Sequence, residues 1–305
     1  MFIAPIVIFV YNRLWHTRQT IEALQKNEFA SESELFIYSD APKNDGAIEL
    51  VSEVRDYIKT ITGFKTITII KRESNWGLAA NIIDGVSEII TRYGKVIVLE
   101  DDHITSPNFL SFMNNALNFY QNEKSVWHIS GWNYPISQED LQDTFLWPTM
   151  NCWGWATWAD RWKYYEKNTD KLIKGFTPEM IKNFNLENLE DFWSQVLDNA
   201  SGKKNTWAIY WYATIFRYNG LCLNPTISFV QNIGHDGTGE NCIDSSYCEN
   251  IILNVKKDIS YSKTIEVSEI AVRKIKAFYR SQKKSLLVRA INKFYRILSG
   301  KNLIQ

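Results

Sequence analysis

The chain has 305 residues, of which 45% are hydrophobic and 22% are charged, and its formal net charge is zero. This composition allows a sizeable core and excludes a disordered chain or a strongly basic, nucleic-acid-binding protein. The four cysteines lack the closely spaced pairs of zinc sites, so we expect reduced thiols in a cytoplasmic protein.

The first 102 residues alternate between strand and helix patterns. Strands are expected at residues 5–10, 34–40, 65–71 and 95–102, with helices at 14–25, 47–61 and 78–93. This alternation predicts an α/β fold with a doubly wound, mostly parallel sheet. The apolar start of the chain is too short to cross a membrane and is interpreted as the first strand.

Polar residues follow three of these strands, at Tyr11 to Arg13, at Asp40 and at Glu100 to Asp102. The carboxyl ends of parallel strands share one edge of a sheet, where ligands bind, so these groups should converge. No Gly-x-Gly-x-x-Gly follows the first strand and no Gly-Lys-Ser/Thr occurs, which disfavours dinucleotide oxidoreductases and phosphate-loop hydrolases. A nucleotide diphosphate neutralised by a metal remains an option.

The second half of the chain is rich in aromatic residues. Its expected elements are a helix from 109 to about 122, a strand at 126–133, helices at 177–198 and 207–218, a strand at 221–230 and a mobile lid at 231–242. Many of the twelve Trp residues lie between Trp127 and Trp211. Aromatic faces stack on sugars, which favours carbohydrate binding, although large cores also use Trp.

The end of the chain is basic. From Ile270 onward it contains ten Lys or Arg residues and no Asp or Glu, with apolar residues at roughly helical spacing. We therefore divide the chain into a domain at 1–250 and an extension at 251–305 that carries a basic amphipathic helix. This helix could lie on an anionic membrane surface or pack its apolar face on the protein, and the pattern leaves both open.

Five stretches resemble the GT-A fold nucleotide-sugar glycosyltransferases. Within that fold they look like a bacterial relative of the N-acetylglucosaminyltransferase that begins complex N-glycans. In order, over about residues 4–240, they are APIVIFVYNR, ELFIYSDAPK, VIVLEDD followed by PNF, HISGWN and NCWGWATWADRW.

The resemblance implies roles for the residues at the strand ends. Arg13 would bind the donor's diphosphate and Asp40 its uracil. Glu100 and Asp101 would bind the donor's sugar and ribose, and Asp102 would hold a divalent metal, Mn²⁺ or Mg²⁺. These roles suit a hard cation that bridges carboxylate and phosphate oxygens.

Further donor-binding residues follow from the same resemblance. Arg72 and Asn81 are similar to donor-side positions of GT-A enzymes. HISGWN, with Trp132, resembles a segment that lines the sugar pocket, and the Gly-Trp segment with Gly154 and Trp155 resembles one near the acceptor.

One departure from the family concerns the general base. In the family's inverting enzymes this base is an Asp in a Trp-Asp-Asp-Trp motif, which falls on residues 207–210, so that Ala208 occupies its position. Asp236, in the expected lid, is the first candidate to replace it, with Asp191 and Asp198 as alternatives. His235 could be a second metal ligand or a diphosphate contact.

The sequence and this resemblance thus predict a metal-dependent glycosyltransferase. Inversion is the family's default, but Ala208 leaves open a different stereochemical course. The enzyme would transfer a sugar from a UDP-sugar to a hydroxyl of a surface glycan such as capsule or lipopolysaccharide, with no nucleic acid partner. A lipid-linked acceptor would account for the basic tail and for a place on the inner face of the cytoplasmic membrane. Two alternatives are a sugar nucleotidyltransferase, whose Gly-rich signature is absent, and a non-catalytic carbohydrate- or nucleotide-binding protein, which Ala208 favours.

Overall fold

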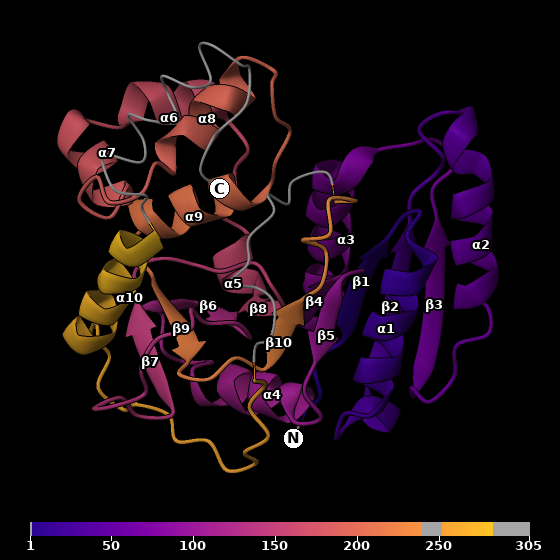
Figure 1. Cartoon of the computed structure of the whole chain (residues 1–305), viewed down its shortest axis with the longest axis horizontal. Coiled ribbons are helices and arrows are strands. Elements are labelled where there is room, and N and C mark those ends of the chain that lie inside the picture. The colour runs from indigo at the N-terminus through magenta and orange to yellow at the C-terminus, as the bar shows by residue number, and fades with distance from the viewer. Residues whose placement is uncertain (1, 240–251, 283–305) are drawn as a thin grey trace.

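The computed structural model describes residues 2–239 and 252–282, which form a mixed α/β fold around one large sheet (Figure 1). In spatial order the strands of this sheet are β3 (Thr66–Lys71), β2 (Glu34–Ser39), β1 (Ile6–Val10), β4 (Lys95–Glu100), β8 (Trp155–Trp158), β6 (Val126–Ser130), β9 (Leu221–Pro225) and β7 (Thr144–Trp147). A second sheet pairs β10 (Val230–Asn232) with β5 (His103–Thr105).

Helices cover both faces of the large sheet. The α-helices are α1 (Leu14–Gln25), α2 (Ile48–Ile58), α3 (Gly77–Tyr93), α4 (Phe109–Phe119), α5 (Ala159–Trp162), α6 (Thr169–Gly175), α7 (Pro178–Phe184), α8 (Trp193–Ala200), α9 (Ala208–Arg217) and α10 (Glu269–Gln282). Two short 3₁₀ turns are η1 (Ala30–Glu32) and η2 (Asp45–Ala47). In Figure 1, α1 to α3 lie at the right and α6 to α9 at the upper left.

The amino-terminal half of the sheet is parallel, as predicted. β3, β2, β1 and β4 are hydrogen-bonded in this order, and all five residues of β1 are buried. Val7 and Phe9 join the hydrophobic cluster beneath α3, whereas Ile6 and Ile8 join the cluster beneath α1 and α2. Because successive side chains of a strand point to opposite faces, an unbroken apolar strand needs helices on both sides.

The carboxy-terminal half of the sheet is mixed, and two of its strands are absent from the sequence prediction. β8 runs antiparallel to β4 and β6, and β7 runs antiparallel to β9. The polar helical region expected at 177–198 consists of two helices, α7 and α8, with an irregular segment between them. Leu186, Glu187 and Asn188 have positive φ angles of 51°, 61° and 64°, which an α-helix does not allow.

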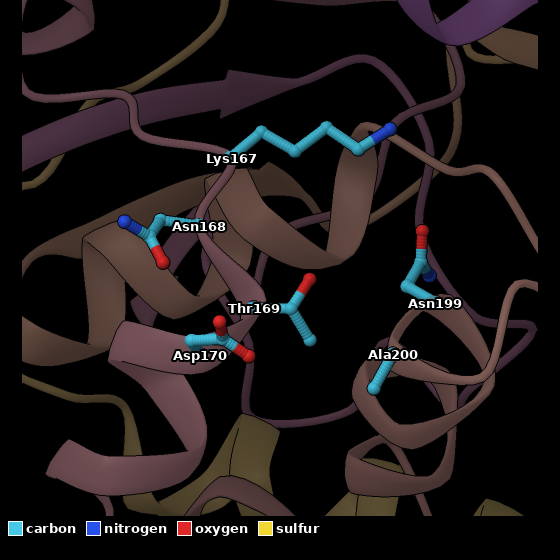
Figure 2. A pocket seen from close by; sticks show the side chains of 6 residues that line it. All are labelled: Lys167, Asn168, Thr169, Asp170, Asn199 and Ala200. Atoms are coloured by element: carbon cyan, nitrogen blue, oxygen red, sulfur yellow. The ribbon is translucent and has the colours of Figure 1, made fainter.

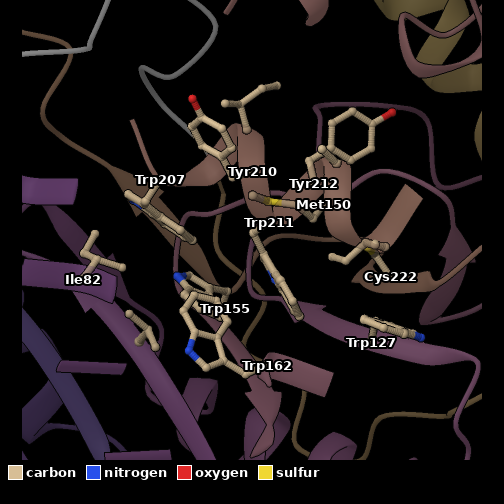
Figure 3. Close-up of a cluster of buried hydrophobic side chains, with 14 of the residues drawn as sticks. Ile82, Trp127, Met150, Trp155, Trp162, Trp207, Tyr210, Trp211, Tyr212 and Cys222 are labelled. Carbon is tan, nitrogen blue, oxygen red and sulfur yellow. The ribbon is translucent and has the colours of Figure 1, made fainter. Parts of the chain in front are cut away.

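The Trp-rich segment builds the core between the sheet and α9. Trp155 is fully buried and stacks on Trp207 with ring centroids 5.1 Å apart (Figure 3). Trp211 donates from Nε1 to His128 Nδ1 at 3.2 Å, and His128 Nε2 lies 2.9 Å from the Asn151 carbonyl oxygen. Burial lowers the pKa of His128 to about 3, so the ring is neutral. These aromatic residues therefore belong to the hydrophobic core.

The described part of the basic tail packs on the protein. α10 buries Ala271 and Ile275 completely, and Lys276 Nζ lies 2.9 Å from Glu187 Oε1. Phe278 packs against the same core as the Trp residues. This supports the packing interpretation for residues 269–282, while residues 283–305 lie outside the described residues. Within the described part of the chain, no helix is both long enough and apolar enough to cross a membrane.

Candidate active site

Arg13 meets two acids at the carboxyl edge of the parallel strands. β1 and β4 are neighbours in register, so the residue that follows β1 by three positions reaches Asp101 and Asp102. Arg13 Nη2 lies 2.7 Å from Asp102 Oδ2 and also contacts Asp101, whose Oδ2 accepts from Nε at 3.4 Å. Burial tends to lower the pKa of Arg13, but the two carboxylates outweigh it and raise the pKa above its ordinary value. The structure thus gathers these predicted residues in one cluster.

Two acids of the cluster, Glu100 and Asp101, have pKa values above those of ordinary carboxyl groups. Burial, together with the charges of Asp102 and Asp101, raises the pKa of Glu100 to about 8, against the opposing effect of Arg13. Burial likewise raises the pKa of Asp101 to about 6, against the opposing effect of Arg13. Three acids beside one arginine leave an excess of negative potential, which a cation would relieve.

His103, directly after the acids, was not singled out from the sequence. Its Nδ1 accepts a hydrogen bond from the Glu100 backbone N–H at 3.1 Å, and its Nε2 lies 3.5 Å from Asp102 Oδ1. Burial lowers the pKa of His103 to about 4, so the ring is neutral and its single proton is on Nε2. The ring therefore points an N–H towards Asp102 and offers no lone pair to a metal there.

The segment expected to be a lid lies directly on this cluster. Its first residues form β10, and Ile233 N donates to the Asp102 carbonyl oxygen at 2.9 Å. A Cβ added to Gly234 would overlap Asp102 Oδ2 and lie 2.9 Å from Asp102 Cγ and 3.1 Å from Arg13 Nη1, so a larger residue would displace the loop or the carboxylate. Asp236 Oδ2 lies 3.0 Å from Nε2 of the buried His16, a second residue that the sequence prediction missed.

The structure offers a limited set of atoms to a cation. Among the described residues, no three or more His, Cys, Asp or Glu side chains are arranged as a metal site. His235, the predicted second ligand, packs its ring edge-on against Trp153 at 5.2 Å between centroids. Asp102 Oδ1 is buried and makes no hydrogen bond within the described residues. One such hard oxygen suits a cation whose other ligands are phosphate oxygens and waters, so the residues fit the predicted metal.

Asp40 shapes a turn beside the cluster. Its Oδ1 accepts from the backbone N–H groups of Ala41 and Trp76, both at 2.9 Å. Its Oδ2 accepts from Gly77 N at 2.8 Å and from Asn75 Nδ2 at 3.1 Å. These four donors use the lone pairs of the carboxylate and fix the start of α3.

Arg72 and Asn81, two residues predicted to bind the donor, contact each other directly. Arg72 Nε donates to Asn81 Oδ1 at 2.8 Å, and its Nη2 pairs with Asp84. The Arg72 guanidinium lies 3.8 Å from the ring centroid of Trp76, and Trp76 is 43% exposed. The sequence prediction gave no binding role to Trp76.

Three other residues that were predicted to bind the donor are buried in the interior of the protein. Trp132 is 2% exposed and packs edge-on against Trp153. Gly154 has a φ of +60°, and a Cβ there would lie 2.7 Å from Val230, so its conformation and its packing both require glycine. Trp155 is completely buried in the aromatic core, so its side chain has no exposed surface for a donor and its predicted binding role is replaced by a packing role.

The position at which the family's motif would place the general base is at the start of α9, where Ala208 is the first helical residue. The two alternative acids make contacts within their own segment of the chain. Asp191 Oδ1 accepts a hydrogen bond from Ser194 N at 3.2 Å, and Asp198 Oδ2 lies 3.8 Å from Lys204 Nζ.

A polar hollow of about 320 Å³ lies between α6 and α8 (Figure 2). It borders the segment before α9, because its Lys167 contacts Asn205 and its Asn199 accepts from Thr206 N at 3.0 Å. The hollow is lined by Lys167, Asn168, Thr169, Asp170, Asn199 and Ala200.

Comparison with solved structures gives distant similarities. A mannosyltransferase from Pyrobaculum calidifontis, PcManGT in complex with GDP-Man and Mn²⁺, is 11% identical, with a TM-score of 0.40 over 71% of this chain and 69% of that one. TarS from S. aureus, residues 1–349, is 11% identical, with a TM-score of 0.42 over 75% and 60%. GalNAc-T7 with UDP, GalNAc and Mn²⁺ is 11% identical, with a TM-score of 0.45 over 73% and 42%. The chain thus spans less than two thirds of the last two proteins.

No curated protein matches the sequence, and the comparisons give no support to the finer resemblance to the N-acetylglucosaminyltransferase of N-glycans. A family profile does match: residues 6–193, more than half of the chain, fit the profile described as glycosyl transferase family 2. The chain therefore belongs to glycosyl transferase family 2 and is a glycosyltransferase that uses a nucleotide-sugar donor.

Proposed function

We propose that this enzyme takes a UDP-sugar together with Mn²⁺ or Mg²⁺ at the edge formed by β1 and β4. The observation that carries the proposal is the buried cluster of Arg13, Asp101 and Asp102 beneath Gly234. Burying several carboxylates beside one arginine is unfavourable unless a ligand completes their charge balance. A divalent cation supplies that balance, and a diphosphate bound with it would pair with the cation and with Arg13.

Each residue of the cluster has a proposed task in donor binding. Asp102 would hold the cation through Oδ1, and the bound cation would stabilise the charge of the leaving diphosphate. Arg13 Nη1, which is buried without a hydrogen bond among the described residues, would donate to the diphosphate. Glu100 and Asp101 would accept hydrogen bonds from donor hydroxyls, and the loop at Gly234 would keep water from the cluster.

The acceptor side of the proposal extends to a surface glycan such as capsule or lipopolysaccharide. We propose that its hydroxyl is activated by Asp236, because Ala208 cannot accept a proton and Asp236 is held beside the cluster by His16. The course would be inverting. The polar hollow near Lys167 could take further sugar units of the acceptor, since it borders the segment that leads into Ala208.

We further propose a domain at 1–250 followed by an extension at 251–305 that approaches an anionic membrane carrying a lipid-linked acceptor. Arg273 and Arg280 of α10 are exposed on the side away from Ala271 and Ile275. Basic side chains near a negative surface contribute about 1 kcal/mol each. Six further basic residues of this extension, from Lys283 to Lys301, lie outside the described part of the chain.

Asp102→Ala tests the donor site, with Asp56→Ala as a control on the exposed surface of α2. Saturating UDP and Mn²⁺ should raise the melting temperature of the wild type, since a ligand at 100 times its Kd stabilises a protein by about 2.7 kcal/mol. The rise should vanish in Asp102→Ala and persist in Asp56→Ala. An equal rise in all three proteins would refute the site, whereas UDP binding with no sugar transfer to any acceptor would favour the non-catalytic alternative.

A further inference from the structure

We propose that Trp76 is the platform on which the base of the donor nucleotide stacks. The inference rests on the proposed position of the diphosphate at Arg13 and Asp102, and it adds the subsite at the other end of the nucleotide. Three observations lead to it: the fixed and exposed ring of Trp76, its place along the sheet edge, and the saturation of Asp40.

The side chain of Trp76 is held in place although it is partly exposed. The backbone N–H of Trp76 donates to Asp40 Oδ1 at 2.9 Å, which fixes the main chain. One face of the ring lies against the Arg72 guanidinium at 3.8 Å, and Arg72 is itself held by Asn81 at 2.8 Å. The residue nevertheless remains 43% exposed. A large aromatic side chain fixed in this way can bind a flat partner without losing rotamer freedom.

The order of the strands places Trp76 at the right distance from the diphosphate. Asp102 follows β4, Arg13 follows β1 and Asp40 follows β2, and these strands are adjacent in that order. Two strand spacings separate β4 from β2, or about 10 Å. A diphosphate at Asp102 and Arg13 that continues along this edge through its ribose brings the base to Asp40 and Trp76. The occupant is therefore the nucleobase and not the acceptor sugar.

The saturation of Asp40 decides how the base is recognised. Both carboxylate oxygens already accept two hydrogen bonds each, from Ala41, Asn75, Trp76 and Gly77, and have no lone pair left for a base N–H. Asp40 is then a positioning residue that presents Trp76. Stacking works with any base, because every base has a π-face. Trp76 should consequently supply affinity for the base with little choice between uracil and guanine.

The test measures the Kd values of UDP, GDP and inorganic pyrophosphate, each with Mn²⁺, on the full chain. Trp76→Ala is compared with Trp76→Phe and with Phe119→Ala, a control residue that is also 43% exposed but lies on α4. Loss of base stacking should weaken UDP and GDP about 5- to 150-fold in Trp76→Ala. Trp76→Phe should recover most of this loss, and pyrophosphate should bind to every variant within twofold of the wild type.

Each other outcome rejects a defined part of the reasoning. Unchanged UDP and GDP binding in Trp76→Ala would overturn the platform. An equal loss of pyrophosphate would also overturn it, since it would show that Trp76 only supports the fold of the edge. A loss for UDP alone would refute the base-tolerant stacking. If the wild type bound no pyrophosphate with Mn²⁺, the proposed diphosphate site would fail first, and the inference with it.

Discussion

Replacing Gly234 by alanine should separate the loop after β10 from the acidic cluster. The φ of Gly234 is not in the left-handed region, so the substitution acts through space alone. The added Cβ would overlap Asp102 Oδ2, the nearest atom, and would lie 2.9 Å from Asp102 Cγ and 3.1 Å from Arg13 Nη1. Non-bonded heavy atoms make favourable contact at about 3.5–4.0 Å, so the loop or the carboxylate must move by more than about 1 Å.

The cost of this movement should appear mainly in donor binding. Overpacking costs about 1–3 kcal/mol, and here it displaces Asp102 and Arg13, the proposed ligands of the cation and the diphosphate. We expect UDP with Mn²⁺ to bind about 5- to 150-fold more weakly, which is the same energy expressed as a ratio of Kd values. Isothermal titration calorimetry measures this ratio directly.

Gly175→Ala is the matched control for this substitution, because it adds the same methyl group where no atom lies within 4 Å. It should bind UDP as the wild type does. If Gly234→Ala also bound UDP and Mn²⁺ within twofold of the wild type, the loop would not constrain the cluster and the reasoning would be refuted.

Two further predictions concern the acids. The folded pKa of Glu100, about 8, lies above its ordinary value of 4.5, so the folded state holds the extra proton and loses stability as the pH rises from about 4.5 to about 8. Glu100→Gln should reduce this decline in chemical denaturation without metal, and an unchanged slope would contradict it. Asp236→Asn should lower kcat about 10²- to 10⁴-fold with UDP binding intact if Asp236 is the base. Equal losses in Asp236→Asn and His16→Gln would instead show that the pair only holds the loop.

The parallel half of the sheet could be predicted because its signals are local. β1 is an unbroken apolar run and β4 contains four consecutive apolar residues, Val96 to Leu99. α1 begins at Leu14 and ends at Gln25, as its apolar periodicity indicates. Once the strands are parallel and adjacent, the meeting of Arg13 with Asp101 and Asp102 follows from topology.

The remaining features depend on contacts between distant residues. β8 exists because Trp155–Trp158 pairs with both β4 and β6, and its short aromatic sequence carries no strand pattern of its own. His16 lies 220 positions before Asp236, and only the folded loop after β10 brings them to 3.0 Å. The high Trp content favoured sugar binding but was equally consistent with a large core, and a large share of these rings fill the space between the sheet and α9. Composition gives the number of aromatic residues and not their exposure.

The charge balance of the cluster connects the fold with donor binding. Glu100, Asp101 and Asp102 face one arginine, and His103 contributes no charge because burial keeps its pKa near 4. Without a ligand, burial and the neighbouring carboxylates raise the pKa of Glu100 to about 8, so Glu100 holds a proton at neutral pH and the cluster carries less negative charge. A cation alone would neutralise the acids but leave Arg13 paired with them, whereas a diphosphate alone would add repulsion. Cation and diphosphate should therefore bind cooperatively, each lowering the Kd of the other by the same factor, because the coupling between two ligands is reciprocal.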